Sequence, residues 1–167
     1  LDYLMLQEFA YNVEVDAPRS IYIHKDTGGE WFLGPLWDFD AGFDFDWGTM
    51  YTGHNYFSSH RELVLGTDPA NRIGGYQVPR FFIDLFKNKR FVSEYKERWL
   101  EVREMVMPVF WETTAMYAEG AAEAMERNAS CWPIDKDYAT EIERMKDWLL
   151  KRRNHLDEVI ANYPAGK

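Results

Sequence analysis

Apolar side chains recur at helical spacing at the start of the chain. They lie three to four positions apart, as on one face of a helix, at Leu1, Leu4, Met5, Phe9 and Val13. Asp2 favours a helix start, and Asp16-Ala17-Pro18 favours its end, because proline disfavours helical backbone at the preceding residue. The pattern predicts a helix over residues 1–13.

The second half of the chain carries four more helical stripes. They predict helices over 78–86, 91–107, 109–128 and from Asp135 or Asp137 to about Asn162. Pro108 is expected to break the second helix, since proline removes a helix hydrogen bond. The last stripe is Ile142, Met145, Leu149, Leu156 and Ile160. Arg152 and Arg153 interrupt it, so either one of them is partly buried against a carboxylate or both extend to solvent.

A short β-hairpin is predicted between these helical regions. Residues 20–24 are rich in β-branched and aromatic side chains, Gly28-Gly29 marks a turn, and residues 31–33 form a return strand. Residues 41–78 then show no sustained period, and an unstructured stretch of this length in a compact domain is usually functional.

Composition and charge narrow the functional classes. The 167 residues are 46% hydrophobic, enough for a substantial core in one domain. The formal net charge of −9 argues against a nucleic-acid or anionic-membrane surface, and no apolar run approaches the ~20 residues of a transmembrane segment. Cys131 is the single cysteine, so we expect no intrachain disulfide and a buried, small apolar side chain there.

Four carboxylates follow the hairpin in two closely spaced pairs. Asp38 and Asp40, then Asp44 and Asp46, are each separated by one aromatic residue. Side chains two apart in an extended segment point to one face, and like charges held together need a cation, a raised pKa or full solvation. Carboxylates are preferred ligands of Mg²⁺, Mn²⁺ and Ca²⁺. The aromatics and the Gly34-Pro35 entry favour a partly buried metal-binding turn over a solvated acidic loop. A structural Ca²⁺ site is less favoured, because the Gly and the terminal Glu of an EF-hand loop are not in place.

Several motifs, taken together, resemble a known family. They are Asn12-Val13-Glu14, the stretch Ser20 to Asp26, the stretch Gly34 to Asp40, Arg98-Trp99 with Arg103, Arg127-Asn128 with Trp132-Pro133, and Trp148-Leu149 with Arg152. On these residues the chain resembles the CotH kinase family, named for spore coat protein H, and in particular its members from Bacteroidetes. The resemblance covers nearly the whole chain.

The resemblance implies a fold as well as an activity. It implies an α+β, predominantly helical protein-kinase-like C-terminal lobe, in which a hairpin carries an acidic metal-binding turn and a helical bundle follows. We expect one domain over residues 1–163. The chain opens inside a helical pattern at Leu1 and contains no glycine-rich phosphate motif, so we expect the nucleotide-binding N-terminal lobe to be absent from it.

Site residues follow from the same resemblance. Asp38, with Asp40 beside it, matches the Asp that holds the metal bridging the ATP phosphates. Glu14 stands where the family has its catalytic Asp, with Asp16 two residues further on, and Ser20 stands where the family has a metal-binding Asn. The resemblance thus implies Mg²⁺ or Mn²⁺ as cofactor, with ATP as the phosphoryl donor in the full-length parent.

Two functions remain open. The first is metal-dependent phosphoryl transfer to protein Ser or Thr by a secreted protein on the cell envelope or outside the cell. The second is a catalytically impaired pseudokinase or binding module, favoured by Glu14, Ser20 and Asp44 in place of the family's residues. Aromatic residues over 43–57 would then dock a protein or glycan ligand; they are Phe43, Phe45, Trp47, Tyr51, Tyr56 and Phe57.

Overall fold

The computed structural model describes residues 1–15, 20–39, 42–43, 60–61, 63–65, 80–132 and 137–163. In chain order the elements are α1 (Asp2–Ala10), the 3₁₀ turn η1 (Val13–Val15), β1 (Ile23–Lys25), β2 (Trp31–Leu33), α3 (Arg80–Leu85), α4 (Lys89–Glu101), the π-helical segment η2 (Val102–Val106), α5 (Met107–Cys131) and α6 (Tyr138–Ala161). The predominantly helical α+β class predicted from the sequence is therefore confirmed. Within these residues no helix is long and apolar enough to cross a membrane.

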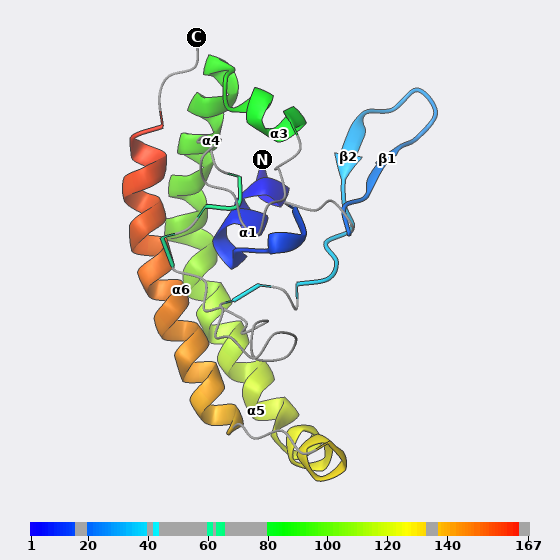
Figure 1. Ribbon diagram of the computed structural model, residues 1–167, viewed down its shortest axis with the longest axis vertical. Helices are drawn as coiled ribbons and strands as arrows, with labels where there is room; N and C mark the ends of the chain where they lie inside the picture. Colours follow the sequence, from blue (N-terminus) through cyan, green and yellow to red (C-terminus); the bar gives the residue numbers. More distant parts are fainter. Residues whose placement is uncertain are drawn as a thin grey trace.

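Two long helical rods form the frame of the molecule. Figure 1 shows α4 and α5 joined end to end through η2, with α6 beside them and α1 against the rods. Contacts between α1 and α6 and between α4 and α6 close the core. Its fully buried side chains include Leu4 of α1, Tyr95 of α4 and Leu149 and Leu156 of α6. The inward stripe predicted for the last helix is confirmed at Leu149, Leu156 and Ile160.

Pro108 does not break the helix in which it lies. The chain stays helical from Lys89 to Cys131, with Pro108 in the first turn of α5 and the π-helical η2 directly before it. A proline at the start of a helix lacks an N–H that would have no partner there, and the wider π turn interrupts the ordinary hydrogen-bond pattern ahead of it. The predicted break is therefore wrong, and one continuous rod replaces two separate helices.

The start of α6 and the last turn of α5 both refine the sequence prediction. Asp137, rather than Asp135, caps α6, with its Oδ2 accepting a hydrogen bond from the Thr140 amide at 2.9 Å. Cys131 was expected to be buried, but it is exposed. It occupies the last turn of α5, where the neighbouring residues are exposed as well, so no core surrounds its thiol.

The first helix ends earlier than predicted. Tyr11 adopts a left-handed conformation with φ 53°, which stops α1 at Ala10 instead of at residue 13. The amides of Tyr11 and Asn12 donate to the carbonyls of Glu8 and Gln7, which satisfies the end of the helix. The chain therefore turns sharply at the point where Asn12 and Glu14 begin.

The hairpin is confirmed, although β1 begins at Ile23 rather than Ser20. Its antiparallel register pairs Ile23 with Leu33 and Lys25 with Trp31, and Gly28 takes a positive φ of 76° in the turn. In Figure 1 it projects away from the helices. Trp31 is 71% exposed, so the hairpin keeps large apolar side chains in contact with solvent.

Arg152 is one of the most buried side chains, and it pairs with a buried carboxylate. Its guanidinium is 0% exposed, forms an ion pair with Glu8, and donates to the carbonyls of Glu8 and His60. The Glu8 carboxylate also accepts the amides of Val64 and Leu65, at 3.0 and 2.8 Å. Of the two outcomes left open by the sequence, burial against a carboxylate is the correct one for Arg152.

Candidate functional site

The turn that follows α1 is organised around one buried amide side chain. Asn12 is 1% exposed, its Nδ2 donates to the carbonyl oxygen of Asp38 at 3.1 Å, and its Oδ1 accepts the Glu14 amide at 3.2 Å. Both polar ends of this side chain are therefore used. Asn12 joins the 12–15 turn to Asp38, which lies 26 positions later in the chain and begins the acidic turn.

The acidic turn differs from its predicted form at Asp38. This residue has φ 62°, in the left-handed region, so the backbone there is not the extended segment that would place alternate side chains on one face. Trp37 is 59% exposed and Asp38 is exposed, so the expected partial burial of this turn is wrong at both residues. Gly34 is buried before the cis Gly34-Pro35 bond, whereas the residues after it face solvent.

Ser20 directly contacts the acidic turn. Its hydroxyl Oγ donates to Asp38 Oδ2 at 2.7 Å, a short hydrogen bond to a charged acceptor. Since this bond uses one oxygen of the carboxylate, it fixes the orientation in which the other oxygen is presented. Two of the residues predicted for the site are thereby brought together.

The far side of the acidic turn is fastened to the end of α1. The Phe43 amide donates to the Ala10 carbonyl at 2.8 Å, and Gly42 passes so close that a Cβ atom there would lie 2.8 Å from the same oxygen. Such an approach requires glycine. Asn12 and the Gly42-Phe43 pair thus hold the turn from both sides against one helix end.

The predicted site residues are only partly described. Glu14 lies in η1, half-buried, with its amide on Asn12. Asp16, Asp40, Asp44 and Asp46 lie outside the described residues, and so do Phe45, Trp47, Tyr51, Tyr56 and Phe57. Asn12 was singled out only as part of a motif. Its place directly after a helix end was the one signal that its side chain would hold backbone groups.

The chemistry of the described donors fits a small, hard cation held together with phosphates. Asp38 and Ser20 offer only oxygen atoms, and Asp38 is exposed enough for water to complete a coordination shell. Among the residues that the structure describes, no group of three or more His, Cys, Asp or Glu side chains could form an all-protein cage. Mg²⁺ commonly binds through one or two carboxylates plus water and substrate phosphates, so this sparse set suits it better than Ca²⁺.

A comparison with known families bears on this arrangement. The model of the family described as CotH kinase protein matches residues 1–156. The chain belongs to the CotH kinase family. No curated protein and no solved structure matches it. Membership in this family makes the chain a kinase-like protein. The matched residues include Asn12, Asp38 and most of the helical region.

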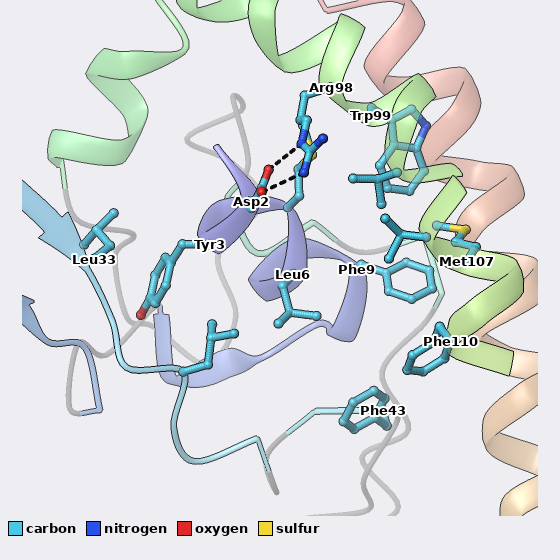
Figure 2. A pocket seen from close by; sticks show the side chains of 14 residues that line it. Asp2, Tyr3, Leu6, Phe9, Leu33, Phe43, Arg98, Trp99, Met107 and Phe110 are labelled. Carbon is cyan, nitrogen blue, oxygen red and sulfur yellow. Dashed lines mark hydrogen bonds and ion pairs between the residues drawn. The ribbon is translucent and has the colours of Figure 1, made fainter. Parts of the chain in front are cut away.

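This CotH family chain also has an apolar pocket beside the acidic turn. The pocket has a volume of about 370 Å³. Figure 2 shows Leu6 and Phe9 of α1, Phe43, and Met107 and Phe110 of α5 around it, with Phe9 beside the two α5 residues. Asp2 and Arg98 are paired at its edge through two hydrogen bonds of 2.7 and 2.9 Å. Hydrogen bonding to Arg98 lowers the pKa of the Asp2 carboxyl, so this pair stays charged at neutral pH.

Leu36 and Phe43 connect the pocket to the acidic turn. Both line the pocket, and they lie on either side of Asp38 in the sequence. The packing that supports the turn therefore continues into the apolar surface of α1 and α5.

Proposed function

We propose that this chain is the C-terminal lobe of a CotH-type protein kinase that transfers the γ-phosphoryl group of ATP to a Ser or Thr hydroxyl of a protein. The observation that carries this proposal is the Ser20–Asp38 hydrogen bond of 2.7 Å, on a turn held to the end of α1 by Asn12. This bond supports a metal-holding role for the Asp38 carboxylate, and Asn12 joins the backbone of Asp38 to that of Glu14. Membership in the CotH kinase family supports the same assignment.

Each residue has a stated role in this proposal. Asp38 and Ser20, with Asp40 as a further carboxylate, would hold Mg²⁺ or Mn²⁺, which when bound neutralises charge on the ATP phosphates. The carboxylate of Glu14, or that of Asp16, would orient the acceptor hydroxyl and take its proton. The acceptor oxygen then carries the phosphoryl group, and ADP leaves with the electrons of the broken P–O bond.

A single metal-holding carboxylate with a hydroxyl beside it has a precedent in chemistry. In P-loop nucleotide hydrolases, Mg²⁺ is held by a Ser or Thr hydroxyl together with an Asp. Ser20 in place of an amide ligand is therefore compatible with metal-dependent phosphoryl transfer.

The test is a calorimetric titration of Mn²⁺ into the chain and into its Asp38→Asn variant, followed by a transfer assay with radiolabelled ATP in the full-length protein. We expect saturable Mn²⁺ binding that Asp38→Asn abolishes, with loss of transfer. Asp26→Asn, in the hairpin turn, is the matched control and should leave both unchanged. Transfer that persists undiminished in Asp38→Asn would refute the proposal.

A second candidate function is a pseudokinase that binds a protein or glycan on the cell surface. It is favoured by the exposed apolar side chains of the hairpin and its flanks, which are Tyr22, Ile23, Trp31, Phe32, Leu36 and Trp37. Aromatic rings at a surface commonly mark recognition sites. A full-length protein that transfers no phosphate, yet loses a specific ligand in Trp37→Ala, would favour this function.

A further inference from the structure

Asn12 connects the two turns on which the proposed reaction depends. Its Nδ2 holds the Asp38 carbonyl at 3.1 Å, and its Oδ1 holds the Glu14 amide at 3.2 Å. Asp38 and Glu14 carry the proposed metal-holding and hydroxyl-orienting carboxylates.

The amide itself is firmly placed. Asn12 is 1% exposed, its own amide N–H donates to the Gln7 carbonyl at 3.0 Å, and its carbonyl accepts the Val15 amide at 3.3 Å. Behind it, Glu8 of the same helix end is paired with the buried Arg152. A side chain held in this way cannot change its position without moving the end of α1.

The conformation of Asp38 depends on such a contact. A non-glycine residue with φ 62° is disfavoured by its Cβ, and the surrounding structure must compensate for this. The Asn12 hydrogen bond reaches the carbonyl of this same residue. It therefore acts on the backbone that decides where the Asp38 carboxylate points.

We infer that Asn12 is the positioning residue of the site: it sets the separation between the Glu14 and Asp38 carboxylates while touching neither substrate nor metal. The inference rests on the proposed function. Because phosphoryl transfer relies on positioning more than on covalent chemistry, loss of this contact should lower the rate more than it weakens substrate binding.

The test compares Asn12→Asp with Asn12→Ser in the full-length protein. Asn12→Asp keeps an oxygen that can accept the Glu14 amide but replaces the Nδ2 donor. Asn12→Ser shortens the side chain, so that both Nδ2 and Oδ1 are lost without a charge being added. Asn162→Asp is the matched control, since it loses a similar bond from Nδ2 to the Glu158 carbonyl of 2.8 Å on the exposed end of α6. Thermal unfolding shows that each variant is folded.

We expect both Asn12 variants to lower kcat on the order of 10- to 100-fold, with the KM for ATP changed less than about threefold. Hydrogen exchange should become faster in peptides covering residues 36–39 and stay unchanged in α5. The control should match wild type in all three measurements.

Three results would contradict the inference in different ways. Wild-type kcat and exchange in Asn12→Ser, in a protein that is active, would overturn the role of Asn12 alone. A wild-type protein without Mn²⁺ binding or transfer would overturn the proposed function, and the inference with it. A fall in thermal stability with kcat unchanged would make Asn12 a structural residue only and would also overturn the inference.

Discussion

Two regions of the molecule differ in where charged and apolar side chains lie. One is the junction between α1 and α6, and the other is the hairpin region. At the junction, Glu8 and Arg152 are fully buried, and backbone groups of His60, Val64 and Leu65 complete their hydrogen bonds. In the hairpin region, residues 20–38, Trp31 and Trp37 lie mostly in solvent, and the Asp38 carboxylate is held by one hydroxyl. Buried, hydrogen-bonded charge thus lies on one side of the 12–15 turn, and the exposed Asp38 carboxylate lies on the other.

This difference shows how a small protein can keep a carboxylate exposed while its backbone is held in place. Under the proposed function, the Asp38 carboxylate would meet a metal and a nucleotide, so it could not be buried as Glu8 is, and its backbone would have to be fixed instead. The rings of Tyr11 and Trp148 lie 5.0 and 5.5 Å from the Arg152 guanidinium, so the residue directly before Asn12 is fixed from below. The end of α1 therefore connects the buried Glu8–Arg152 pair to the Asn12–Asp38 hydrogen bond.

The largest effect is expected from breaking the junction. Arg152→Met would leave the Glu8 carboxylate buried without its cation and should lower the free energy of unfolding by about 3–5 kcal/mol. Urea denaturation of the variant measures it. Arg153→Met, on a neighbouring position whose guanidinium contacts only Asn154 among the hydrogen bonds described, should change it by less than about 0.5 kcal/mol.

A matched change in the hairpin region sharpens the contrast. Trp31→Ala removes a large ring that is 71% exposed and whose described partner is Lys25, 5.2 Å from its centroid. The loss should stay within about 1 kcal/mol. Equal losses in Trp31→Ala and Arg152→Met would show that stability is spread evenly and would remove the distinction between the two regions.

An intermediate effect is expected where the two regions meet. Gly42→Ala would place a Cβ 2.8 Å from the Ala10 carbonyl oxygen, so the helix end or the acidic turn must shift. We expect a loss of about 1–3 kcal/mol, together with weaker Mn²⁺ binding, measured by urea denaturation and calorimetry.

Gly120→Ala provides the control for that change. Nothing lies within 4 Å of a Cβ at Gly120, in the exposed middle of α5, so alanine should stabilise the protein by up to about 1 kcal/mol through helix propensity. Gly42→Ala with wild-type stability and Mn²⁺ affinity would show that the close approach is unimportant.

The smallest effect concerns pH at the edge of the junction. The rings of His60 and His155 lie 6.5 Å apart. Burial lowers the pKa of each below its ordinary value of 6.5, and the charges of Arg61 and Arg152 lower it further, whereas a hydrogen bond with the Arg61 backbone opposes the shift at His155. Lys151 adds to this effect at His60, and Asp147 opposes it. The unfolded chain therefore binds protons more readily, so stability is full above pH 6.5 and falls as the pH drops below it.

His155→Gln should reduce this loss. Comparing urea midpoints at pH 7.5 and pH 5.5 for the variant and the wild type cancels the contribution of other titrating groups. An identical pH dependence in both proteins would contradict a role for the histidine pair.

The sequence predicts the helices well because their packing follows a local period. The stripe of α6 and the Asp137 cap depend on residues within a few turns of each other, as does the hairpin turn at Gly28-Gly29. The predicted break at Pro108 was wrong because the identity of a residue does not reveal that a π turn precedes it. Cys131 misled because burial depends on how far α5 extends beyond the core.

The site was predictable only as far as its motifs reach. Ser20 and Asp38 were both singled out, but nothing in their spacing shows that the hydroxyl donates to the carboxylate. Arg152 finds Glu8 across 144 positions, and Asn12 finds Asp38 across 26. Contacts of this kind depend on how separate elements meet, which a local pattern does not contain.

The dimensions of the hairpin also bear on how the protein behaves when it is concentrated. A strand edge can template the strand of another molecule, and exposed Ile23 and Trp31 would favour such pairing. Each strand is only three residues long, and Lys25 places a charge in β1. Short, charged strands resist aggregation. Lengthening both strands of this hairpin by a few apolar residues would therefore favour self-association through the strand edges.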